Sequence, residues 1–426
     1  MSQHPHILNR FAVIPTAERL RVPDDRGARG VTMAFIDNGF TSDHPDLKGR
    51  VREVHQVGSA GNAWHGTQTS VVAAGDGKLS DGVYRGLAWQ AELVLVAVGE
   101  VTDESVLAGL AWLERNHRRL GVRVLSISLG ADDPLVDRAV ERLVDQGVTV
   151  VVAAGNSGCT RNPGCVPPAT ASSVLTVGGS DDGNRLDQSP ELYCSSYDDN
   201  GLKPEVIAPA IWVAAPLVPG SDEWHTAERL ARELALPDYR LPRPRHEIEQ
   251  ELRSRKLVSA HYQHVDGTSF AAPLVASLAA RMLELNPRLT PAGIKQILMS
   301  TATFLEGQPR LRQGFGVVDA PAALQHVMAP RITSPLVGLE SCTFTVLEPA
   351  ASSVELFADW LPGLQPLKRS GAIWRATVPA PPPGRHGYKF RLDGQRWEED
   401  PSNPNRMEDG VGGFNSQLEI GRPERS

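Results

Sequence analysis

The chain has 426 residues, and this length predicts two or three domains with a sizeable buried core. A composition of 41% hydrophobic and 22% charged residues is typical of soluble globular proteins. The formal net charge of −7 at pH 7 argues against a nucleic-acid-binding protein, because the chain has no excess of basic residues to neutralise phosphates.

The N-terminal stretch MSQHPHILNRFAVIPTAERL has no long apolar run after a basic start. We therefore expect no signal peptide and a cytoplasmic protein. No apolar run in the sequence reaches the length of a membrane-spanning helix, so no membrane association is predicted.

The four cysteines are too few for a disulfide scaffold: Cys159, Cys165, Cys194 and Cys342. Cys159 and Cys165 are close enough in sequence to pair in an oxidising compartment, but without an export signal we expect free thiols. No Cys/His spacing matches a zinc site, and we predict no metal or other cofactor.

From about residue 31 to residue 330, short apolar runs alternate with helix-like segments. The runs are almost continuously apolar, as in strands buried on both faces of a sheet: VTMAFID, ELVLVAVG, VRVLSISLG and VTVVVAAG. The helix-like segments have clear end signals, such as Asp133-Pro134 and Thr290-Pro291 at helix starts and Gly121 beyond a helix from Thr102 to His117. This alternation predicts an α/β fold with a doubly wound, mostly parallel sheet.

Residues 219–260 interrupt this alternation. TAERLARELALP and RHEIEQELRSRK predict two polar amphipathic helices, separated by the proline-rich DYRLPRPR. We interpret this segment as a surface insertion. One alternative is a solvated decoration without a role, and the other is a functional element next to the residues that follow it.

After residue 330 the sequence changes to short segments with alternating apolar residues, separated by turn residues: VELFADW, IWRATVP, HGYKFRL and SQLEI. These segments predict a separate small all-β domain. The predicted domains are therefore residues 1–330, with the helical insertion, and residues 331–426.

The turn HVDGTSFAAP at residues 264–273 has two interpretations. In the first, Ser269 only belongs to a helix start, where Ser and Thr accept hydrogen bonds from unpaired N–H groups. In the second, Ser269 is a nucleophile, and its candidate partners are Asp37, His65 and Asn156. Each partner also fits a turn or a cap, but all lie at predicted strand ends or helix starts. Because ligands bind at the carboxyl ends of strands in open α/β sheets, these residues are expected to converge.

Five motifs, in chain order, resemble those of the subtilisin-like serine peptidases. AFIDNGF, followed by HPDL at 44–47, resembles their aspartate motif, and HGTQTSVVAAG at 65–75 resembles their histidine motif. SISLG at 126–130 is similar to their substrate-binding strand, AAGNSG at 153–158 to their oxyanion motif, and DGTSFAAPLVA at 266–276 to their serine motif. The order Asp, His, Ser is also theirs. The resemblance covers about residues 30–325 and implies a serine endopeptidase that acts on polypeptides.

The resemblance implies a role for each candidate. Ser269 attacks the scissile carbonyl, His65 takes its proton and passes it to the leaving amine, and Asp37 orients the imidazole. The side-chain amide of Asn156 and the backbone N–H of Ser269 hold the oxyanion. The competing class is a pseudopeptidase that only binds polysaccharide or a partner, and the intact set of four residues argues against it.

Two further groups of residues are implied to contact the substrate. Pairing with the substrate backbone, as an added strand, is implied for Ser128, Leu129 and Gly130. The resemblance also implies that one wall of the main specificity pocket is lined by Ala153, Ala154 and Gly155.

The chain departs from the family pattern at a few positions. Gln68 replaces a histidine in HGTH, and Leu274 and Ser277 depart from AAPHVAG, but none of these is a triad position. Asp46 matches a calcium ligand of some relatives. Its other ligands are not recognisable, so we assign no calcium site.

Only about thirty residues precede the first predicted strand, too few for the propeptide that usually precedes the aspartate motif. Control by the helical insertion or by a partner is one hypothesis, and unaided folding is the alternative. If residues 219–260 gate the cleft, their deletion is expected to raise activity on a small peptide.

The C-terminal domain resembles the glycogen-binding module of the AMP-activated kinase β subunit and the isoamylase N-terminal domain, over about residues 340–421. The resemblance rests on FADWLPGLQPL, PGRHGYKFRLDGQRWEEDPSNP and DGVGGFNSQLEI, and it implies an immunoglobulin-like β-sandwich. It also implies that Trp360 and Trp397 stack on sugar rings, with Lys389 and Asn415 as hydrogen-bonding groups. The partner is then an α-glucan. The alternative is that the tryptophans fill the core and the domain braces the peptidase or docks a regulatory protein.

Overall fold

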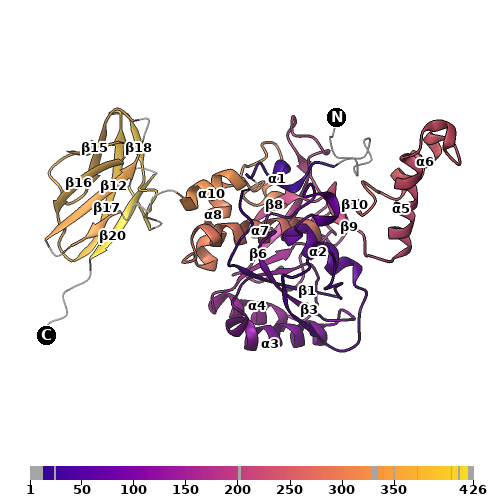
Figure 1. The fold of residues 1–426 in the computed structure, drawn as a ribbon. Coiled ribbons are helices and arrows are strands. Elements are labelled where there is room, and N and C mark those ends of the chain that lie inside the picture. The colour runs from indigo at the N-terminus through magenta and orange to yellow at the C-terminus, as the bar shows by residue number, and fades with distance from the viewer. Residues whose placement is uncertain are drawn as a thin grey trace. The chain divides into compact units, whose positions relative to one another are not determined.

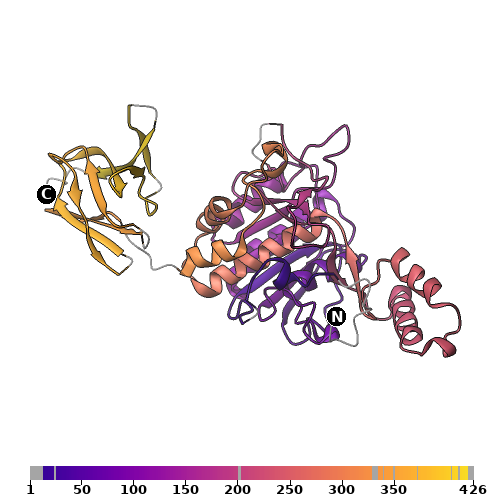
Figure 2. The ribbon, with the colours of Figure 1, turned by 90° about the horizontal axis from the view of Figure 1, so that it is seen from above.

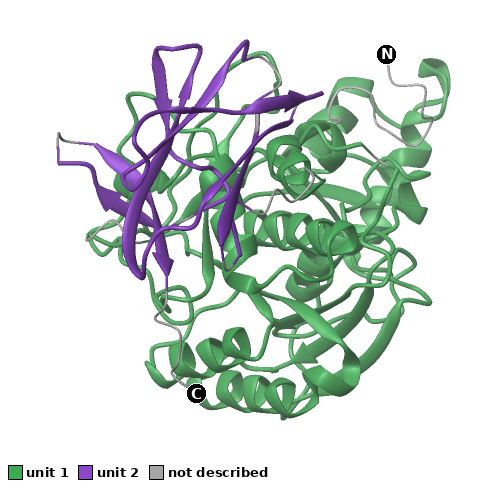
Figure 3. Cartoon of the chain, turned by 90° about the vertical axis from the view of Figure 1, so that its left-hand side faces the viewer, with its two compact units in different colours: residues 1–328 green, residues 329–426 purple. Residues whose placement is uncertain are grey.

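The structure is a computed structural model that describes residues 13–23, 25–199, 203–328, 334–338, 340–348, 351–371, 373–403, 405–410 and 413–420. The chain divides into two compact units, residues 1–328 and residues 329–426 (Figure 3). The domain boundary predicted from the sequence, between residues 330 and 331, lies outside the described residues.

The larger unit is built on an eight-stranded sheet with the order β2-β3-β1-β4-β5-β6-β7, in which β8 also pairs with β6 (Figure 1). All of its strand pairs are parallel except β6 with β7. This confirms the predicted doubly wound α/β architecture. The strands are β1 Thr32–Asp37, β2 Val51–Gln56, β3 Glu92–Ala97, β4 Val122–Ile127, β5 Thr149–Ala153, β6 Leu175–Asp181, β7 Glu191–Leu192 and β8 Val206–Pro209.

The central strands are apolar throughout because both faces of the sheet are covered. In β1, Met33 and Phe35 belong to the core that includes residues of α2 and α7, while Ala34 and Ile36 belong to the core under α3 and α4. Helices therefore lie on both faces of the sheet (Figures 1 and 2). Burial of each large aliphatic side chain contributes roughly 1.5–3 kcal/mol, so this double layer stabilises the sheet edge that carries the site.

The predicted helix ends agree closely with the structure. Thr102 caps the N-terminus of α3 by accepting a hydrogen bond from the Ser105 N–H at 3.1 Å, and Gly121 follows its last residue in a left-handed conformation. Among the described helices, none is both long and apolar enough to cross a membrane. The helices are α1 Thr16–Arg19, α2 Trp64–Ala74, α3 Asp103–Leu120, α4 Leu135–Asp145, α5 Asp222–Leu234, α6 Arg245–Ser254, α7 Thr268–Leu285, α8 Pro291–Thr301, α9 Arg310–Gln313 and α10 Ala320–Met328.

The insertion forms a helical hairpin, α5 and α6, between the antiparallel strands β9 (Val213–Pro216) and β10 (Tyr262–Val265). It has a small apolar core of its own: Leu217, Ala227, Leu230, Ile248, Leu252 and Leu257. Both views show α5 and α6 projecting away from the main sheet (Figures 1 and 2). The hydrogen bonds and ion pairs of these helices with described residues reach none of the four catalytic candidates. This position does not support a cover over the cleft.

The smaller unit consists of antiparallel sheets, as predicted from its alternating pattern. One sheet has the order β11-β12-β16-β15, and the other has the order β14-β13-β17-β20-β19 with β18 paired to β17. Their shared core contains Phe344, Tyr388 and Phe390. The strands are β11 Leu336–Val337, β12 Ser341–Leu347, β13 Val354–Ala358, β14 Gln365–Pro366, β15 Lys368–Ser370, β16 Ile373–Pro379, β17 Gly384–Leu392, β18 Arg396–Glu398, β19 Arg406–Glu408 and β20 Phe414–Ile420.

The prediction of four free thiols is wrong. Cys159 forms a disulfide with Cys194, and their Cα atoms are 5.3 Å apart. Cys165 and Cys342 are free. The sequence spacing allowed only for a pair between Cys159 and Cys165 in an oxidising compartment. The fold instead brings the segment after β7 back against the loop that contains Cys159.

Candidate active site

Asp37 is the last residue of β1, at the carboxyl edge of the parallel sheet. Only 1% of its surface is exposed. Its carboxylate accepts hydrogen bonds from the Asn38 N–H at 2.8 Å and from the Thr69 hydroxyl at 3.3 Å. These donors compensate the buried charge and orient both oxygens toward α2.

His65 lies in the first turn of α2, and its Nδ1 is 2.9 Å from both carboxylate oxygens of Asp37. Because a carboxylate can only accept, Nδ1 donates its proton and Nε2 is left as an acceptor. Burial lowers the pKa of His65, but the hydrogen bond and the charge of Asp37 raise it, and the pKa lies above the usual 6.5.

Gly66 makes this close approach possible. A Cβ atom at this position would lie 2.3 Å from the Gly39 carbonyl oxygen and 2.9 Å from the Asp37 Cβ. Any larger residue would therefore push the start of α2 away from the end of β1. Gly66 thus allows the short distance between the His65 imidazole and the Asp37 carboxylate.

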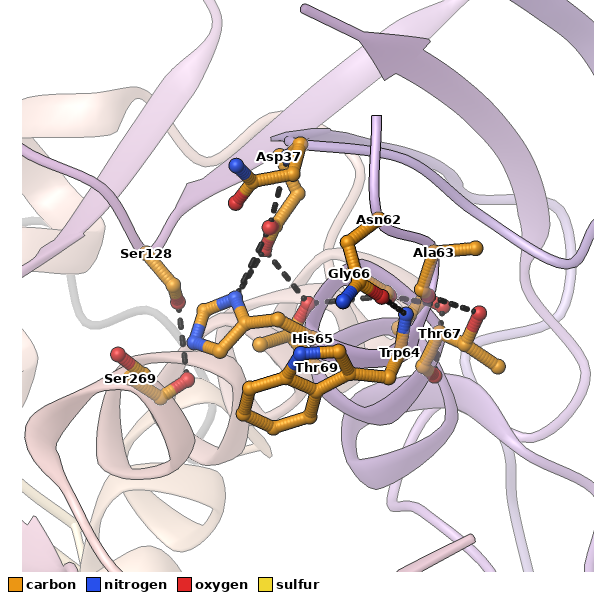
Figure 4. Close-up of polar contacts among 12 residues, drawn as sticks. Asp37, Asn62, Ala63, Trp64, His65, Gly66, Thr67, Thr69, Ser128 and Ser269 are labelled. Carbon is orange, nitrogen blue, oxygen red and sulfur yellow. Dashed lines mark hydrogen bonds and ion pairs between the residues drawn. The ribbon is translucent and has the colours of Figure 1, made fainter. Parts of the chain in front are cut away.

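Ser269 is the second residue of α7, next to the imidazole of His65. Figure 4 shows the His65 ring between the Asp37 carboxylate and Ser269. The Ser128 hydroxyl donates to the Ser269 carbonyl at 2.9 Å, which fixes the backbone of the nucleophile turn. Gly267, with φ of 134°, forms the sharp turn before the helix. The Ser269 hydroxyl forms no hydrogen bond with a described residue, so it is available to a substrate.

Asn156 lies in the loop after β5 and is held by the start of α7. Its Oδ1 accepts hydrogen bonds from the Thr268 N–H at 3.0 Å and from the Thr268 hydroxyl at 3.1 Å. The acceptor end of the amide is therefore occupied, and the Nδ2 donor has no hydrogen bond to a described residue. Helix termini also leave their first backbone N–H groups unpaired, as at Ser269. Both the Asn156 Nδ2 and the Ser269 backbone N–H are thus free of hydrogen bonds to described residues.

Together these residues place a serine hydroxyl, an imidazole bound to a buried carboxylate, and an amide held by the start of α7 at one edge of the sheet. The family model of the subtilases matches residues 28–317. The chain belongs to the subtilase family.

Three curated relatives extend this comparison. Serine protease AprX of Bacillus subtilis is 30% identical over 323 residues, 68% of this chain and 65% of that protein. The extracellular serine proteinase of Thermus sp. is 27% identical over 279 residues, 64% of this chain and 55% of that protein. Subtilisin DY of Bacillus licheniformis is 27% identical over 318 residues, 72% of this chain and 96% of that protein. This subtilase therefore spans 65% and 55% of the lengths of the first two.

Two solved structures share the fold. Fervidolysin of Fervidobacterium pennivorans, described as a keratinolytic enzyme related to subtilisin, has a TM-score of 0.54 and 22% identity over 88% of this chain and 53% of its own. The prenylagaramide maturation protease PagA has a TM-score of 0.52 and 19% identity over 71% of this chain and 95% of its own. At these identities the likeness concerns the fold.

The predicted substrate-contacting residues of this subtilase lie directly after β4 and at the carboxyl end of β5, which are parallel neighbours. Ser128 is buried, Leu129 is half-buried and Gly130 is exposed, whereas Ala154 is buried between the half-buried Ala153 and Gly155. Beside Gly130 lies a cavity of about 320 Å³, lined by Val101, Thr102, Asp103, Gly130, Ala131, Asp132 and Val166. The substrate contacts themselves stay a prediction.

Asp46 does not have the free oxygens that a calcium ligand needs. Its Oδ1 accepts from the Leu79 N–H at 2.9 Å, and its Oδ2 accepts from the Tyr262 hydroxyl. Both Asp46 and Tyr262 are fully buried. No group of three or more His, Cys, Asp or Glu residues suited to a metal is found in the described part of the chain. The residues at Asp46 thus do not fit a cation.

The four sugar-binding candidates of the smaller unit do not all come together. Trp397 is 44% exposed, and the Lys389 ammonium lies 5.5 Å from the centre of its ring. Asn415 is 9% exposed and lies beside Gly387 and Met407. Trp360 instead packs against the core and donates its indole N–H to the Pro379 carbonyl at 3.0 Å.

Sequence reasoning missed the residues that hold the candidate catalytic groups in place. Thr268, which binds Asn156 and also accepts from the Gly155 N–H at 3.1 Å, belongs to the serine motif but looked like a capping residue. Thr69 lies one helical turn after His65, and this spacing is the signal that could have identified it.

Proposed function

We propose that this subtilase is a serine endopeptidase that hydrolyses peptide bonds through Asp37, His65 and Ser269. The observation that carries the proposal is the buried Asp37 carboxylate, 2.9 Å from Nδ1 of a histidine whose other nitrogen is left for Ser269. This arrangement has the roles of a catalytic triad.

The reaction follows from the position of each group. His65 Nε2 takes the hydroxyl proton while the Ser269 oxygen attacks the scissile carbonyl. The Asn156 side-chain N–H and the Ser269 backbone N–H donate to the oxyanion. His65 then protonates the leaving amine, and water repeats the sequence in reverse to release the acyl group from Ser269.

A fluorophosphonate probe tests this proposal, because it labels only a serine that is activated as a nucleophile. Native protein is expected to be labelled, and Ser269→Ala is not. Ser157→Ala is a matched control, since this loop serine should not affect labelling. If the native, folded protein is not labelled, the endopeptidase proposal is wrong and the pseudopeptidase interpretation is favoured.

We also propose that the smaller unit docks a ligand through the face around Trp397, either an α-glucan or a regulatory protein. Support comes from the exposed indole, with Lys389 at 5.5 Å and Arg391 at 5.8 Å from the ring centre. Aromatic faces beside polar groups suit sugar stacking. Because Trp360 packs against the core, the proposed docking face contains only one of the two tryptophans that the resemblance implies.

Affinity electrophoresis of the full chain through glycogen distinguishes these partners. If the ligand is a glucan, the chain is retarded and Trp397→Ala is not. Leu336→Ala is the matched control, because this exposed residue lies on the other sheet. Absence of retardation would rule out glycogen and leave the regulatory protein.

A further inference from the structure

We propose that the Cys159–Cys194 disulfide positions the Asn156 amide for oxyanion binding, so that its reduction lowers the catalytic rate. The proposal rests on the peptidase function proposed above. It concerns the loop from Gly155 to Cys159, called the oxyanion loop below, and the segment Cys194–Ser196.

The oxyanion loop is bound along its length to this segment. The Ser196 N–H donates to the Gly155 carbonyl at 2.8 Å, the Ser157 N–H donates to the Ser196 hydroxyl at 3.1 Å, and the Gly158 N–H donates to the Cys194 carbonyl at 3.0 Å. The disulfide lies at the far end of this ladder. Three hydrogen bonds and one covalent bond thus hold a loop of five residues.

The two segments are also packed without spare room. A Cβ atom at Gly158 would lie 1.8 Å from the Ser195 carbonyl oxygen, and one at Gly155 would lie 2.8 Å from the Ser196 hydroxyl. Gly155 has φ of 97°, a conformation that favours glycine. The backbone of the oxyanion loop therefore follows the path of the opposite segment.

Asn156 lies between this ladder and the nucleophile helix. Its Oδ1 is held by the Thr268 N–H and hydroxyl, while its Nδ2 is left for the substrate. Asn156 itself is exposed, so packing does not hold its side chain. The position of the amide therefore depends on the backbone of the oxyanion loop and on the backbone at the start of α7. The disulfide fixes the backbone of the oxyanion loop. A misplaced donor loses transition-state stabilisation steeply, because such donors act through their preorganisation.

The disulfide is accessible to reductants, since Cys159 is exposed and Cys194 half-buried. A dithiol breaks the S–S bond, each sulfur of the protein ends as a thiol, and two electrons and two protons come from the dithiol, which becomes a cyclic disulfide. Cys165 does not compete, because burial and the nearby Asp198 raise the pKa of its thiol to about 12 and only a thiolate attacks disulfides. Cys342 is buried in the other unit.

A double-mutant cycle in kcat tests the proposal. Cys159→Ser/Cys194→Ser is expected to lower kcat by about tenfold with KM changed by less than about twofold, because the amide acts on the transition state. In the Asn156→Ala background the same pair of changes is expected to alter kcat by less than about twofold. An equal loss in both backgrounds would show a general structural effect, and no loss in the native background would also overturn the proposal. Cys165→Ser is the matched control and should leave kcat unchanged.

Reversible reduction of the native chain gives a second readout that needs no cysteine variant. Titration with a thiol reagent under denaturing conditions is expected to count two free thiols before a dithiol is added and four afterwards. Activity should fall with the appearance of the extra thiols and return on reoxidation. Four thiols in a fully active protein would overturn the inference, whereas inactivity of the oxidised, folded protein would instead contradict the proposed peptidase function.

Discussion

Both carboxylate oxygens of Asp37 lie 2.9 Å from Nδ1 of His65. The carboxylate is almost completely buried, so solvent screens its charge only weakly. Two opposing effects act on the pKa of His65. Burial lowers this pKa, whereas the hydrogen bond to Asp37 and the charge of Asp37 raise it by more, so the net shift is upward. The His65 imidazole is therefore more basic than an isolated histidine.

This pair predicts the acid limb of the pH–rate profile. His65 must be neutral to accept a proton from Ser269, so kcat should fall as the pH decreases through a pKa above 6.5. Asp37→Asn is expected to shift this limb to lower pH and to reduce kcat by about 10⁴-fold, because the amide neither stabilises the imidazolium nor holds the tautomer. Steady-state rates between pH 5 and pH 9, roughly the range in which histidine titrates, check both. An acid limb at the same pH in both proteins would contradict the assignment.

Asn156→Ala is expected to lower kcat by about 10²- to 10³-fold with little change in KM, since the amide binds the oxyanion and not the ground-state carbonyl. Peptide hydrolysis under saturating and limiting substrate separates the two constants. Asn162→Ala, an exposed residue of the same loop region, is the matched control. A change confined to KM would assign Asn156 to ground-state binding.

Which of these features the sequence could predict depends on how local they are. The carboxyl end of β1 and the starts of α2 and α7 lie at the borders of apolar runs in the sequence, so the sequence alone predicts that Asp37, His65 and Ser269 meet at one sheet edge. The partner of Cys159 could not, because it depends on where the chain returns 35 residues later. Asp46 and Tyr262 are 216 residues apart, and their contact depends on the antiparallel pairing of β9 with β10. These two short strands have no clear strand pattern in the sequence.

Tyr262→Phe is expected to destabilise the larger unit by about 1–3 kcal/mol, because it leaves a buried Asp46 oxygen without its donor. Burial raises the pKa of Asp46, whereas the Tyr262 hydrogen bond lowers it, so the substitution raises that pKa further. A group with a raised folded-state pKa loses its stabilising contribution as the pH rises through that pKa. The loss should thus be larger at neutral pH than at acidic pH, where Asp46 is protonated.

Urea unfolding at the two pH values measures this difference. Tyr84→Phe is the matched control, because its ring lies 5.2 Å from that of Tyr262 but its hydroxyl forms no bond to Asp46. Equal destabilisation at both pH values would show that the Asp46 charge is not involved.

Replacement of residues 219–255 by a short glycine-serine linker tests the role of the helical hairpin. The gating hypothesis predicts higher activity on a small peptide, whereas the projection of α5 and α6 away from the sheet predicts a kcat/KM within about twofold of the native value. We expect the second result. Lys256 is kept, because it forms an ion pair with Asp266, three residues before Ser269. A marked rise in a folded deletion would restore the gating hypothesis.

The cavity beside Gly130 predicts a preference for basic substrate residues. Asp103 and Asp132 line it, the Asp132 N–H donates to an Asp103 oxygen at 2.7 Å, and neither carboxylate forms an ion pair with a described residue. Gly130 lies two residues beyond Ser128. A substrate strand that pairs with this segment advances about 3.3 Å per residue, so it brings a side chain a few positions from the scissile bond to this cavity.

Each carboxylate is expected to favour Arg or Lys over Leu by about two- to fivefold in kcat/KM, the range of partly exposed ion pairs. A peptide series that varies one position at a time before the scissile bond measures this preference. Asp103→Asn/Asp132→Asn should remove it while retaining the hydrogen bond, and Asp145→Asn, exposed at the end of α4, is the matched control. Added salt should weaken the preference in the native protein, because charges at the surface are screened over about 10 Å. Cleavage that ignores charge at every position would show that the substrate path does not reach this cavity.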